Sequence, residues 1–238
     1  MKFSNQTIAV VGGSSGIGFA TANAAHVQGA TVILVGRSLD RLHQAITKIG
    51  SHVRILQADV EDESSVAVAF ADIGVLDHLF VSAQDATTAP LTKTTKEQLR
   101  PTLDSKIWGA FHVAKHAAPQ LSKSGSITFI SGLAGRRGYA GFAVAGAANA
   151  GIEAVARNLA VELAPIRVNT LCAGVIDTPM LDRLFGDQRS QIVEAIAQKL
   201  PVQRIGTPEE IADAVLFLMS NGFITGTMLL LDSGDALV

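Results

Sequence analysis

Residues 11–18 read VGGSSGIG, and this stretch decides the fold. It follows a short apolar run, Thr7–Val11, and it opens a helix-length segment that begins at Gly16. Glycines at positions 12, 16 and 18 let a backbone turn sharply from a strand into a helix and approach a pyrophosphate closely. The amino end of such a helix offers unpaired N–H groups and a positive dipole. The stretch therefore predicts a phosphate-binding turn; an ordinary glycine-rich turn is the alternative.

Short apolar runs alternate with helix-length segments along the rest of the chain. The runs are continuous rather than alternately polar, which is typical of strands covered on both faces. The predicted strands are Thr7–Val11, Thr31–Val35, Val53–Gln57, His78–Ser82, Ser126–Ser131, Arg167–Leu171 and Met228–Leu231. The predicted helices are Gly16–Gln28, Leu39–Ile49, Glu63–Ile73, Lys96–Gln120, Ala143–Leu163 and Pro208–Met219. This order predicts one doubly wound α/β domain over residues 1–238, with a parallel sheet and helices on both faces.

The segment from Pro179 to Leu200 interrupts this alternation, and Gly186 and Pro201 punctuate it. Mobile segments over the carboxyl ends of strands commonly carry substrate specificity. We therefore expect residues 179–201 to form an inserted substrate lid.

Composition and charge exclude several classes of protein. Apolar residues make up 48% of the 238 residues and charged residues 17%, which favours a sizeable core and argues against long disorder. The 19 basic and 21 acidic side chains give a net charge of −2 without blocks of like charge, so no nucleic-acid partner is expected. The longest weakly polar stretch, Gly138–Ala156, carries Asn149 and Glu153 and predicts a buried helix rather than a membrane span. One cysteine and no visible targeting segment fit a cytoplasmic protein.

The ends of the second and third predicted strands indicate which nucleotide the turn would bind. An acidic residue after the second strand would bind a ribose 2′-hydroxyl and favour NAD, but the chain has Arg37 and Ser38 there. These two offer a guanidinium and a hydroxyl to a 2′-phosphate, which favours NADP; a solvated surface arginine is the alternative. After the third strand, Asp59 and Val60 are expected to meet the adenine, and Asp59 could also be a helix N-cap.

Eight segments together resemble the short-chain dehydrogenase/reductase family. They are GGSSGIG at 12–18, GRS at 36–38, ADV at 58–60, ISG at 130–132, RVNTLCAG at 167–174, IDTPM at 176–180, RIGTPEEIA at 204–212 and ITG at 224–226. The resemblance runs from about Thr7 to Gly234. It implies a Rossmann-type domain with a seven-stranded parallel sheet, an NAD(P)-dependent oxidoreductase with a small-molecule substrate, and a homodimer or homotetramer.

The resemblance also implies a set of cofactor-binding residues. The family's nicotinamide loop resembles residues 173–179, where the Val175 backbone and the Thr178 hydroxyl would lie near the carboxamide and the pyrophosphate. At the fourth strand the family usually shows Asn-Asn-Ala-Gly, whereas residues 82–85 read Ser-Ala-Gln-Asp. The expected NADP(H)-binding residues are Gly12, Ser14, Ser15, Gly16, Ile17, Gly18, Arg37, Ser38, Asp59, Val60, Ala83, Asn149, Gly174, Val175 and Thr178.

The family's four catalytic positions carry other residues in this chain. The family uses a tyrosine that exchanges a proton, a lysine four residues later, a serine that polarises the carbonyl and an asparagine that anchors a water. The matching register places Ala145 at the tyrosine, Asn149 at the lysine, Gly132 at the serine and Lys106 at the asparagine. A desolvated Lys106 would have a lowered pKa and could donate a proton. A long surface lysine is the alternative.

Neighbouring side chains offer few substitutes. Ser131 is one residue from the serine position, where the alternation of a strand favours the opposite direction, and it is a tentative catalytic residue. Tyr139, the only tyrosine, lies six residues before Ala145 and is expected at a surface or an interface. His112 and His116 are four residues apart on one predicted helix without a third ligand, so no metal site is expected.

Two functions remain compatible with these residues. One is an NADP(H)-dependent oxidoreductase that acts on an unidentified carbonyl or alcohol with a non-standard proton donor. The other is a catalytically silent NADP(H)-binding sensor, regulator or assembly partner. A methyltransferase that binds S-adenosylmethionine is disfavoured, because such sites usually place an acid where Arg37 stands.

Overall fold

The predicted apolar runs form one sheet in the computed structural model, which describes residues 1–85 and 87–238. The strand order is β3-β2-β1-β4-β5-β6-β7, and each neighbouring pair is parallel. The strands are β1 (Thr7–Val11), β2 (Thr31–Gly36), β3 (Val53–Gln57), β4 (Leu76–Val81), β5 (Leu121–Gly132), β6 (Arg167–Ala173) and β7 (Met228–Leu231). The helices are α1 (Gly16–Val27), α2 (Leu39–Ile49), α3 (Glu63–Ala71), α4 (Lys96–Leu103), α5 (Gly109–Ala117), α6 (Ala143–Glu162), α7 (Pro179–Phe185), α8 (Arg189–Ala197) and α9 (Pro208–Ser220). The predicted α/β architecture is confirmed.

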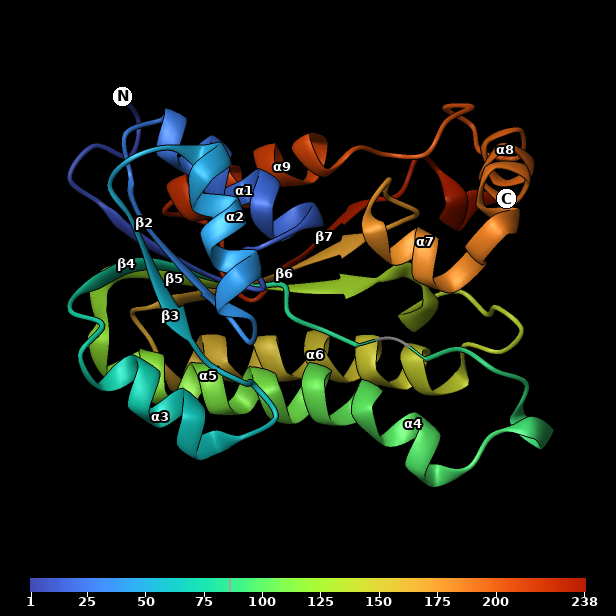
Figure 1. Ribbon diagram of the computed structural model, residues 1–238, viewed down its shortest axis with the longest axis horizontal. Helices are drawn as coiled ribbons and strands as arrows, with labels where there is room; N and C mark the ends of the chain where they lie inside the picture. The colour runs from blue at the N-terminus through green and yellow to red at the C-terminus, as the bar shows by residue number, and fades with distance from the viewer. Residues whose placement is uncertain (86) are drawn as a thin grey trace.

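Helices cover both faces of this sheet (Figure 1). On one face lie α1, α2 and α9, where Leu34, Leu42 and Val215 belong to one buried cluster. On the other lie α3, α5 and α6, where Phe70 and Val113 belong to a second buried cluster. The inner strands β1, β4 and β6 are therefore buried on both faces, which explains why they are continuous apolar runs, whereas the edge strands β3 and β7 are only partly buried.

The sequence predicts one helix over Lys96–Gln120, and the structure divides this stretch into four parts. After α4 comes a π-helical segment, Asp104–Trp108, followed by α5 and a 3₁₀ turn, Ala118–Gln120. Pro101 lies inside α4 and has no N–H to donate to the helix. The prediction of a uniform helix was wrong in this respect. The π-helical segment carries Lys106, and such segments are frequent at functional sites.

The helix α9 is capped at both ends. Thr207 and Glu210 form a capping box: the Glu210 carboxylate accepts the Thr207 N–H at 2.9 Å, and the Thr207 hydroxyl accepts the Glu210 N–H at 3.3 Å. At the other end, the buried guanidinium of Arg167 on β6 donates to the carbonyls of Leu218 at 2.7 Å and Met219 at 2.6 Å. These bonds hold α9 against the sheet.

No helix in the described part of the chain has the length and apolar character that a membrane crossing requires. The weakly polar stretch Gly138–Ala156 contributes the beginning of α6, whose Ala148 and Ile152 are buried. The buried helix that the sequence predicts there is confirmed, and the cellular compartment stays a prediction.

Candidate cofactor crevice and catalytic positions

The strand order reverses at β1, because the chain passes from β3 across the sheet to β4. In open α/β sheets, ligands bind outside the carboxyl ends of the strands at such a switch point. Backbone hydrogen bonds join the strand ends here. The Gly12 N–H donates to the Val35 carbonyl at 2.8 Å, and the Ser82 N–H donates to the Val11 carbonyl at 2.9 Å. The glycine-rich turn therefore lies at the floor of a crevice between the ends of β2 and β4.

Close approaches within the turn require glycine. Gly12 has a φ of +84°, and a Cβ there would lie 2.7 Å from the Ala83 nitrogen. A Cβ on Gly18 would lie 2.2 Å from the Gly12 carbonyl oxygen. Gly16, with a φ of +52°, begins α1 after Ser15 in extended conformation. The first amides of a helix have no acceptor within it, so this turn offers free donors where side chains are absent. The other expected turn residues, Ser14 and Ile17, are half-buried.

Arg37 extends from the end of β2 towards the end of β4. Its side chain is 56% exposed, and 3.1 Å separates its Nη2 from the Oδ2 of Asp85. Ser38 is the N-cap of α2, and its hydroxyl accepts the Arg41 N–H at 3.3 Å. Arg37 is therefore ion-paired rather than simply solvated. Sequence reasoning missed the partner, although the departure from the family at residues 82–85 marked the place.

Asp59 and Val60 follow β3 at the next strand end. The Asp59 carboxylate accepts the Glu61 N–H at 3.1 Å, whereas the N-cap of α3 is Asp62, which accepts the Ser64 N–H at 2.9 Å. The interpretation of Asp59 as a helix N-cap was therefore wrong, because the N-cap of α3 lies three residues later, at Asp62. Burial and the negative charge of Asp59 raise the pKa of Glu61. This end of the crevice is acidic.

The loop after β6 returns to the glycine-rich turn. A Cβ on Gly174 would lie 2.7 Å from the Asp232 Cα, so backbone packs tightly at this point. The Val175 carbonyl accepts a backbone hydrogen bond at 3.0 Å from the segment that precedes α9. Thr178 is the N-cap of α7 without a side-chain cap hydrogen bond, and its Cγ2 would lie 3.2 Å from a Cβ on Gly16. The loop and the turn thus form adjacent walls of one crevice.

Lys106 points into the protein from the π-helical segment. The residue is 5% exposed, and its Nζ donates a hydrogen bond to the Gln84 Oε1. Burial lowers the pKa of Lys106 to about 7, and the opposing effect of Cys172 and Glu153 is smaller. The interpretation of Lys106 as a surface lysine was therefore wrong. An ammonium group with a pKa near neutrality is suited to general acid–base catalysis.

Near Lys106, the buried carboxylate of Glu153 on α6 contacts two polar side chains. Glu153 is 4% exposed. The Ser131 hydroxyl donates to its Oε1 at 2.9 Å, and the Arg136 Nη2 lies 2.6 Å from its Oε2. Sequence reasoning assigned no role to Glu153, although its spacing of four from Asn149 places both on one helix face. The Ser131 hydroxyl makes an internal hydrogen bond, and its part in catalysis stays a prediction.

Gly132, Ala145 and Asn149 meet where β5 and α6 adjoin. A Cβ on Gly132 would lie 3.0 Å from the Asn149 Nδ2. Ala145 lies near the start of α6 and is 8% exposed. Gly132 pairs with Ala173 of β6, so this junction adjoins the loop that returns to the glycine-rich turn. Neither Gly132 nor Ala145 brings a polar side-chain atom to it.

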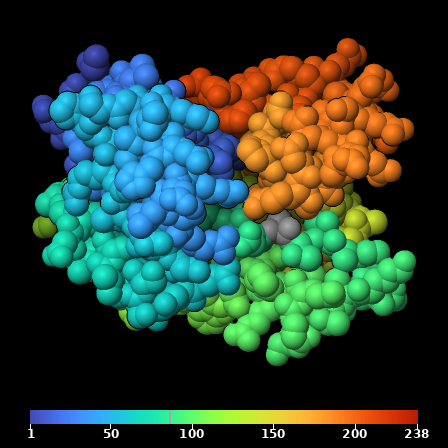
Figure 2. Space-filling model, viewed as in Figure 1, coloured from blue at the N-terminus to red at the C-terminus, as the bar shows by residue number. Residues whose placement is uncertain are grey.

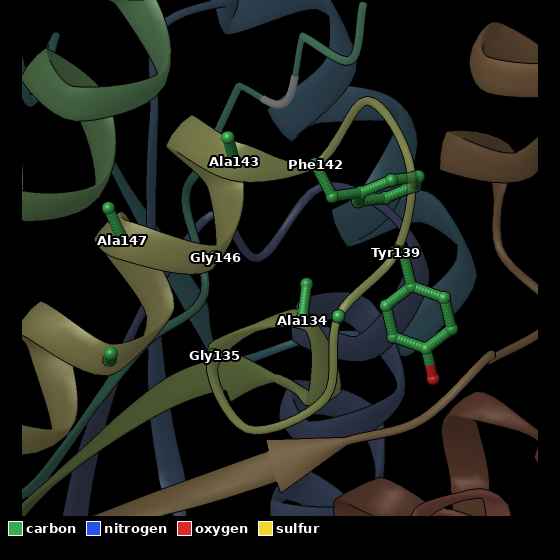
Figure 3. A pocket seen from close by; sticks show the side chains of 9 residues that line it. Ala134, Gly135, Tyr139, Phe142, Ala143, Gly146 and Ala147 are labelled. Atoms are coloured by element: carbon green, nitrogen blue, oxygen red, sulfur yellow. The ribbon is translucent and has the colours of Figure 1, made fainter. Parts of the chain in front are cut away.

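A cavity of about 330 Å³ opens beside this junction, between the loop after β5 and the start of α6 (Figure 3). Ala134, Phe142 and Gly146 are among the residues that line it, together with Tyr139. The Tyr139 hydroxyl donates to the Asp235 Oδ2 at 2.7 Å. Burial and this hydrogen bond raise the pKa of Tyr139, so the phenol keeps its proton. Tyr139 therefore forms part of the cavity wall and is tied to Asp235.

His112 and His116 on α5 make contacts with α3 and with the segment before it. The His112 Nδ1 lies 2.8 Å from the Val60 carbonyl oxygen, and the His116 Nε2 lies 3.2 Å from the Glu63 Oε1. Both contacts connect α5 to α3 and to the segment before it. Within residues 1–85 and 87–238, the His, Cys, Asp and Glu side chains form no group of three that could hold a metal ion.

Known proteins share this sequence pattern and architecture. A family model described as "Enoyl-(Acyl carrier protein) reductase" matches residues 11–235. Carbonyl reductase family member 4 of Xenopus laevis is 33% identical over 238 residues, which cover 97% of this chain and 98% of that protein. A solved short chain dehydrogenase/reductase family protein aligns over 100% of both chains with a TM-score of 0.91 and 33% identity. A small-chain dehydrogenase solved in complex with NADPH aligns over 98% of this chain and 99% of that one, with a TM-score of 0.83 and 34% identity.

Proposed function

We propose, since this chain belongs to the short-chain dehydrogenase/reductase family, that it is an NADP(H)-dependent oxidoreductase acting on a carbonyl or an alcohol. The observation that carries the proposal is the glycine-rich turn at the switch point of the sheet, with Arg37 at the neighbouring strand end. We further propose that Lys106, rather than a tyrosine, provides the proton.

The crevice fits a dinucleotide with an additional phosphate. A Cβ at Gly12 or Gly18 would collide with backbone atoms, so only glycine keeps the turn in this tight shape, and the amino end of α1 offers donors to a pyrophosphate. Arg37 would bind the 2′-phosphate, and Thr178 and Asn149 would bind the nicotinamide half. When bound, NADPH supplies a hydride to the carbonyl carbon. The similarity to a dehydrogenase solved with NADPH supports this assignment.

Lys106 completes the reduction in this proposal. When the carbonyl carbon accepts a hydride, its oxygen becomes an alkoxide, and this oxygen takes a proton from the Lys106 ammonium to give the alcohol. The neutral amine then regains a proton from water. A pKa of about 7 leaves the ammonium populated near neutral pH and makes it a stronger acid than an exposed lysine. The Gln84 Oε1 accepts a hydrogen bond from the Nζ and so orients it.

We propose that residues 179–201, which include α7 and α8, act as a lid over the substrate. The Gln84 Nε2 lies 3.9 Å from the Met180 Sδ, so α7 already contacts the residue that orients Lys106. In the space-filling view, the orange surface of this segment faces the blue surface of the first helices across a furrow (Figure 2). Closure of a lid would exclude water from the reacting groups.

A catalytically silent NADP(H)-binding protein is the second candidate. The absence of polar side-chain atoms at Gly132 and Ala145 favours it, because both polarisation and protonation of a carbonyl need them. One experiment separates the candidates: NADPH consumption over a broad panel of aldehydes and ketones, measured beside a titration of NADPH binding. Binding with consumption supports the oxidoreductase, binding without consumption supports the silent protein, and no binding contradicts both.

We also propose a homodimer or homotetramer that forms through α5 and α6 and the segment before α5. Trp108 is 55% exposed, Phe111 42% and Val161 80%, and the rings of Trp108 and Phe111 lie 6.1 Å apart between centroids. Exposed apolar side chains on neighbouring helices often mark interfaces. Light scattering at micromolar concentration should give a multiple of the chain mass, and a monomer mass would contradict the proposal.

A further inference from the structure

The ion pair between Arg37 and Asp85 crosses the mouth of the crevice. Arg37 follows β2 and Asp85 follows β4, and β1 lies between these two strands. Strands that are separated by one neighbour are about 10 Å apart. The 3.1 Å contact between the two side chains therefore has to pass over the end of β1, where the glycine-rich turn begins. A dinucleotide in this crevice brings its adenosine ribose to the same place.

The backbones at both ends of the pair are anchored. The Asp85 N–H donates to the Ser105 hydroxyl at 2.9 Å, and this buried hydroxyl donates in turn to the Pro101 carbonyl at 2.7 Å. On the other side, the Gln57 Nε2 donates to the Arg37 carbonyl at 2.9 Å. The two charged side chains thus start from fixed positions on opposite sides of the crevice.

Several carboxylates lie near Glu61, which is itself within electrostatic range of Arg37. Burial is the largest cause that raises the pKa of Glu61, the negative charges of Asp59, Asp85 and Asp104 raise it further, and the positive charge of Arg37 lowers it. Arg37 therefore lies in an acidic rim. A phosphate that approaches Arg37 has to compete with a carboxylate already in contact and is repelled by the others.

We propose that Asp85 is a specificity-determining residue that occupies Arg37 until the 2′-phosphate of the cofactor displaces it. The inference rests on the proposed NADP(H) function. Binding of NADPH creates a contact between Arg37 and the phosphate, but it breaks the pair with Asp85 and brings two negative groups together. NADH has no 2′-phosphate and leaves the pair intact. Asp85 therefore reduces the preference for NADPH over NADH that Arg37 alone would set.

The substitution Asp85→Asn tests the inference by calorimetric titration with NADPH and, separately, with NADH. We expect the Kd for NADPH to fall about three- to tenfold, because loss of an exposed ion pair and of a repulsion act together. The Kd for NADH should change by less than about twofold. Asp104→Asn is the matched control. It removes the same negative charge from the same rim, but Asp104 pairs with Arg100 at 2.9 Å and not with Arg37.

Two further variants sharpen the test. In the double variant Arg37→Ala with Asp85→Asn, the gain in NADPH affinity should shrink to the small change of the Asp104→Asn control, because the competition requires Arg37. If circular dichroism shows that Asp85→Asn does not fold, Asp85→Ala replaces it with the same expected gain.

The outcomes separate this inference from the function on which it rests. NADPH binding that is unchanged or weaker in the folded Asp85 variant overturns the inference and leaves the proposed function standing. An equal gain in NADPH affinity in Asp104→Asn also overturns the inference, because the loss of any negative charge from the rim would then explain the gain. If neither the unmodified protein nor any variant binds NADPH or NADH, the inference and the proposed function fail together.

Discussion

The glycine-rich turn and the junction of β5 with α6 lie in the same crevice. The function of the turn depends on its backbone shape, whereas that of the junction depends on which polar side chains reach it. At the turn, a Cβ on Gly12 or Gly18 would collide with backbone atoms, so its shape tolerates no other residue. At the junction, Gly132 and Ala145 bring no polar atom, and the buried cation lies at Lys106 on a neighbouring helical segment. No other element of the fold can replace the backbone shape of the glycine-rich turn. A proton donor needs only to reach the reacting atom, so another element can supply it.

Replacement of Lys106 should have the largest effect on the rate of carbonyl reduction. If the rate did not change, the buried cation at Lys106 would not be the proton donor. We expect Lys106→Ala to lower residual carbonyl reduction by about 10²–10⁴-fold, the contribution of a positioned general acid. The affinity for NADPH should change little, because Arg37 and the glycine-rich turn remain. Reduction by the unmodified protein should also fall as the pH rises above about 7, where Lys106 loses its proton.

The control for this variant is Lys115→Ala on α5, whose ammonium lies 2.6 Å from Glu63 and outside the crevice. It should leave the rate and its pH profile unchanged. A Lys106→Ala protein that still reduces ketones at about 1–10³ s⁻¹, the usual range for enzymes, would show that a different group is the acid.

The residues that the resemblance assigns to the junction of β5 and α6 can be introduced there to test whether this junction can support catalysis. The triple variant Gly132→Ser, Ala145→Tyr and Asn149→Lys should raise reduction of a simple activated ketone by about 10²-fold or more. The three changes belong together, because a Cβ on Gly132 would lie 3.0 Å from the Asn149 Nδ2. Steady-state rates at saturating NADPH measure the effect. A rate no higher than that of the unmodified protein in a folded triple variant would mean that the pocket does not hold these side chains in a catalytic geometry.

A smaller effect is expected at the mouth of the crevice. Arg37→Ala should raise the Kd for NADPH about tenfold to a hundredfold, because a charge-assisted hydrogen bond contributes roughly 1.5–3 kcal/mol. The Kd for NADH should barely move. Fluorescence titration with both cofactors measures the difference, and equal losses for the two would contradict the assignment of the 2′-phosphate to Arg37.

The dependence of stability on pH is the smallest expected effect. Burial lowers the pKa of Lys106 from 10.5 to about 7, so between these values the unfolded chain binds a proton that the folded protein has lost. The free energy of unfolding should therefore rise with pH, at up to about 1.4 kcal/mol per pH unit, over the window from pH 7.5 to 8.5. Lys106→Met should flatten this slope in urea unfolding experiments. Parallel slopes for the two proteins would show that Lys106 is not desolvated in solution.

The sheet and the turn could be predicted because their signals are contiguous. Each strand is an apolar run a few residues long, and residues 11–18 contain the whole strand-to-helix turn. The strand β5 is longer than the predicted Ser126–Ser131 and begins at Leu121, because pairing of Leu121 with Leu76 of β4 extends it through polar residues. Periodicity cannot show such an extension, since the partner strand decides it.

The polar contacts of the site depend on residues far apart in the sequence. Arg37 and Asp85 are 48 residues apart, and Lys106 and Gln84 are 22 apart. A single lysine on a predicted helix reads as a solvated surface residue in the sequence. Its burial follows from the packing of the π-helical segment under α6, and no local pattern encodes that packing.

The hydrogen bond between Tyr139 and Asp235 also has a consequence for the order in which the protein is made. These partners are 96 residues apart, and Arg137, which lies over the Tyr139 ring, pairs with the same carboxylate. During synthesis on a ribosome, the glycine-rich turn and Arg37 emerge early, while the cavity wall at Tyr139 waits for Asp235. The cavity wall on the substrate side therefore forms only after Asp235 has been made, later than the glycine-rich turn and Arg37.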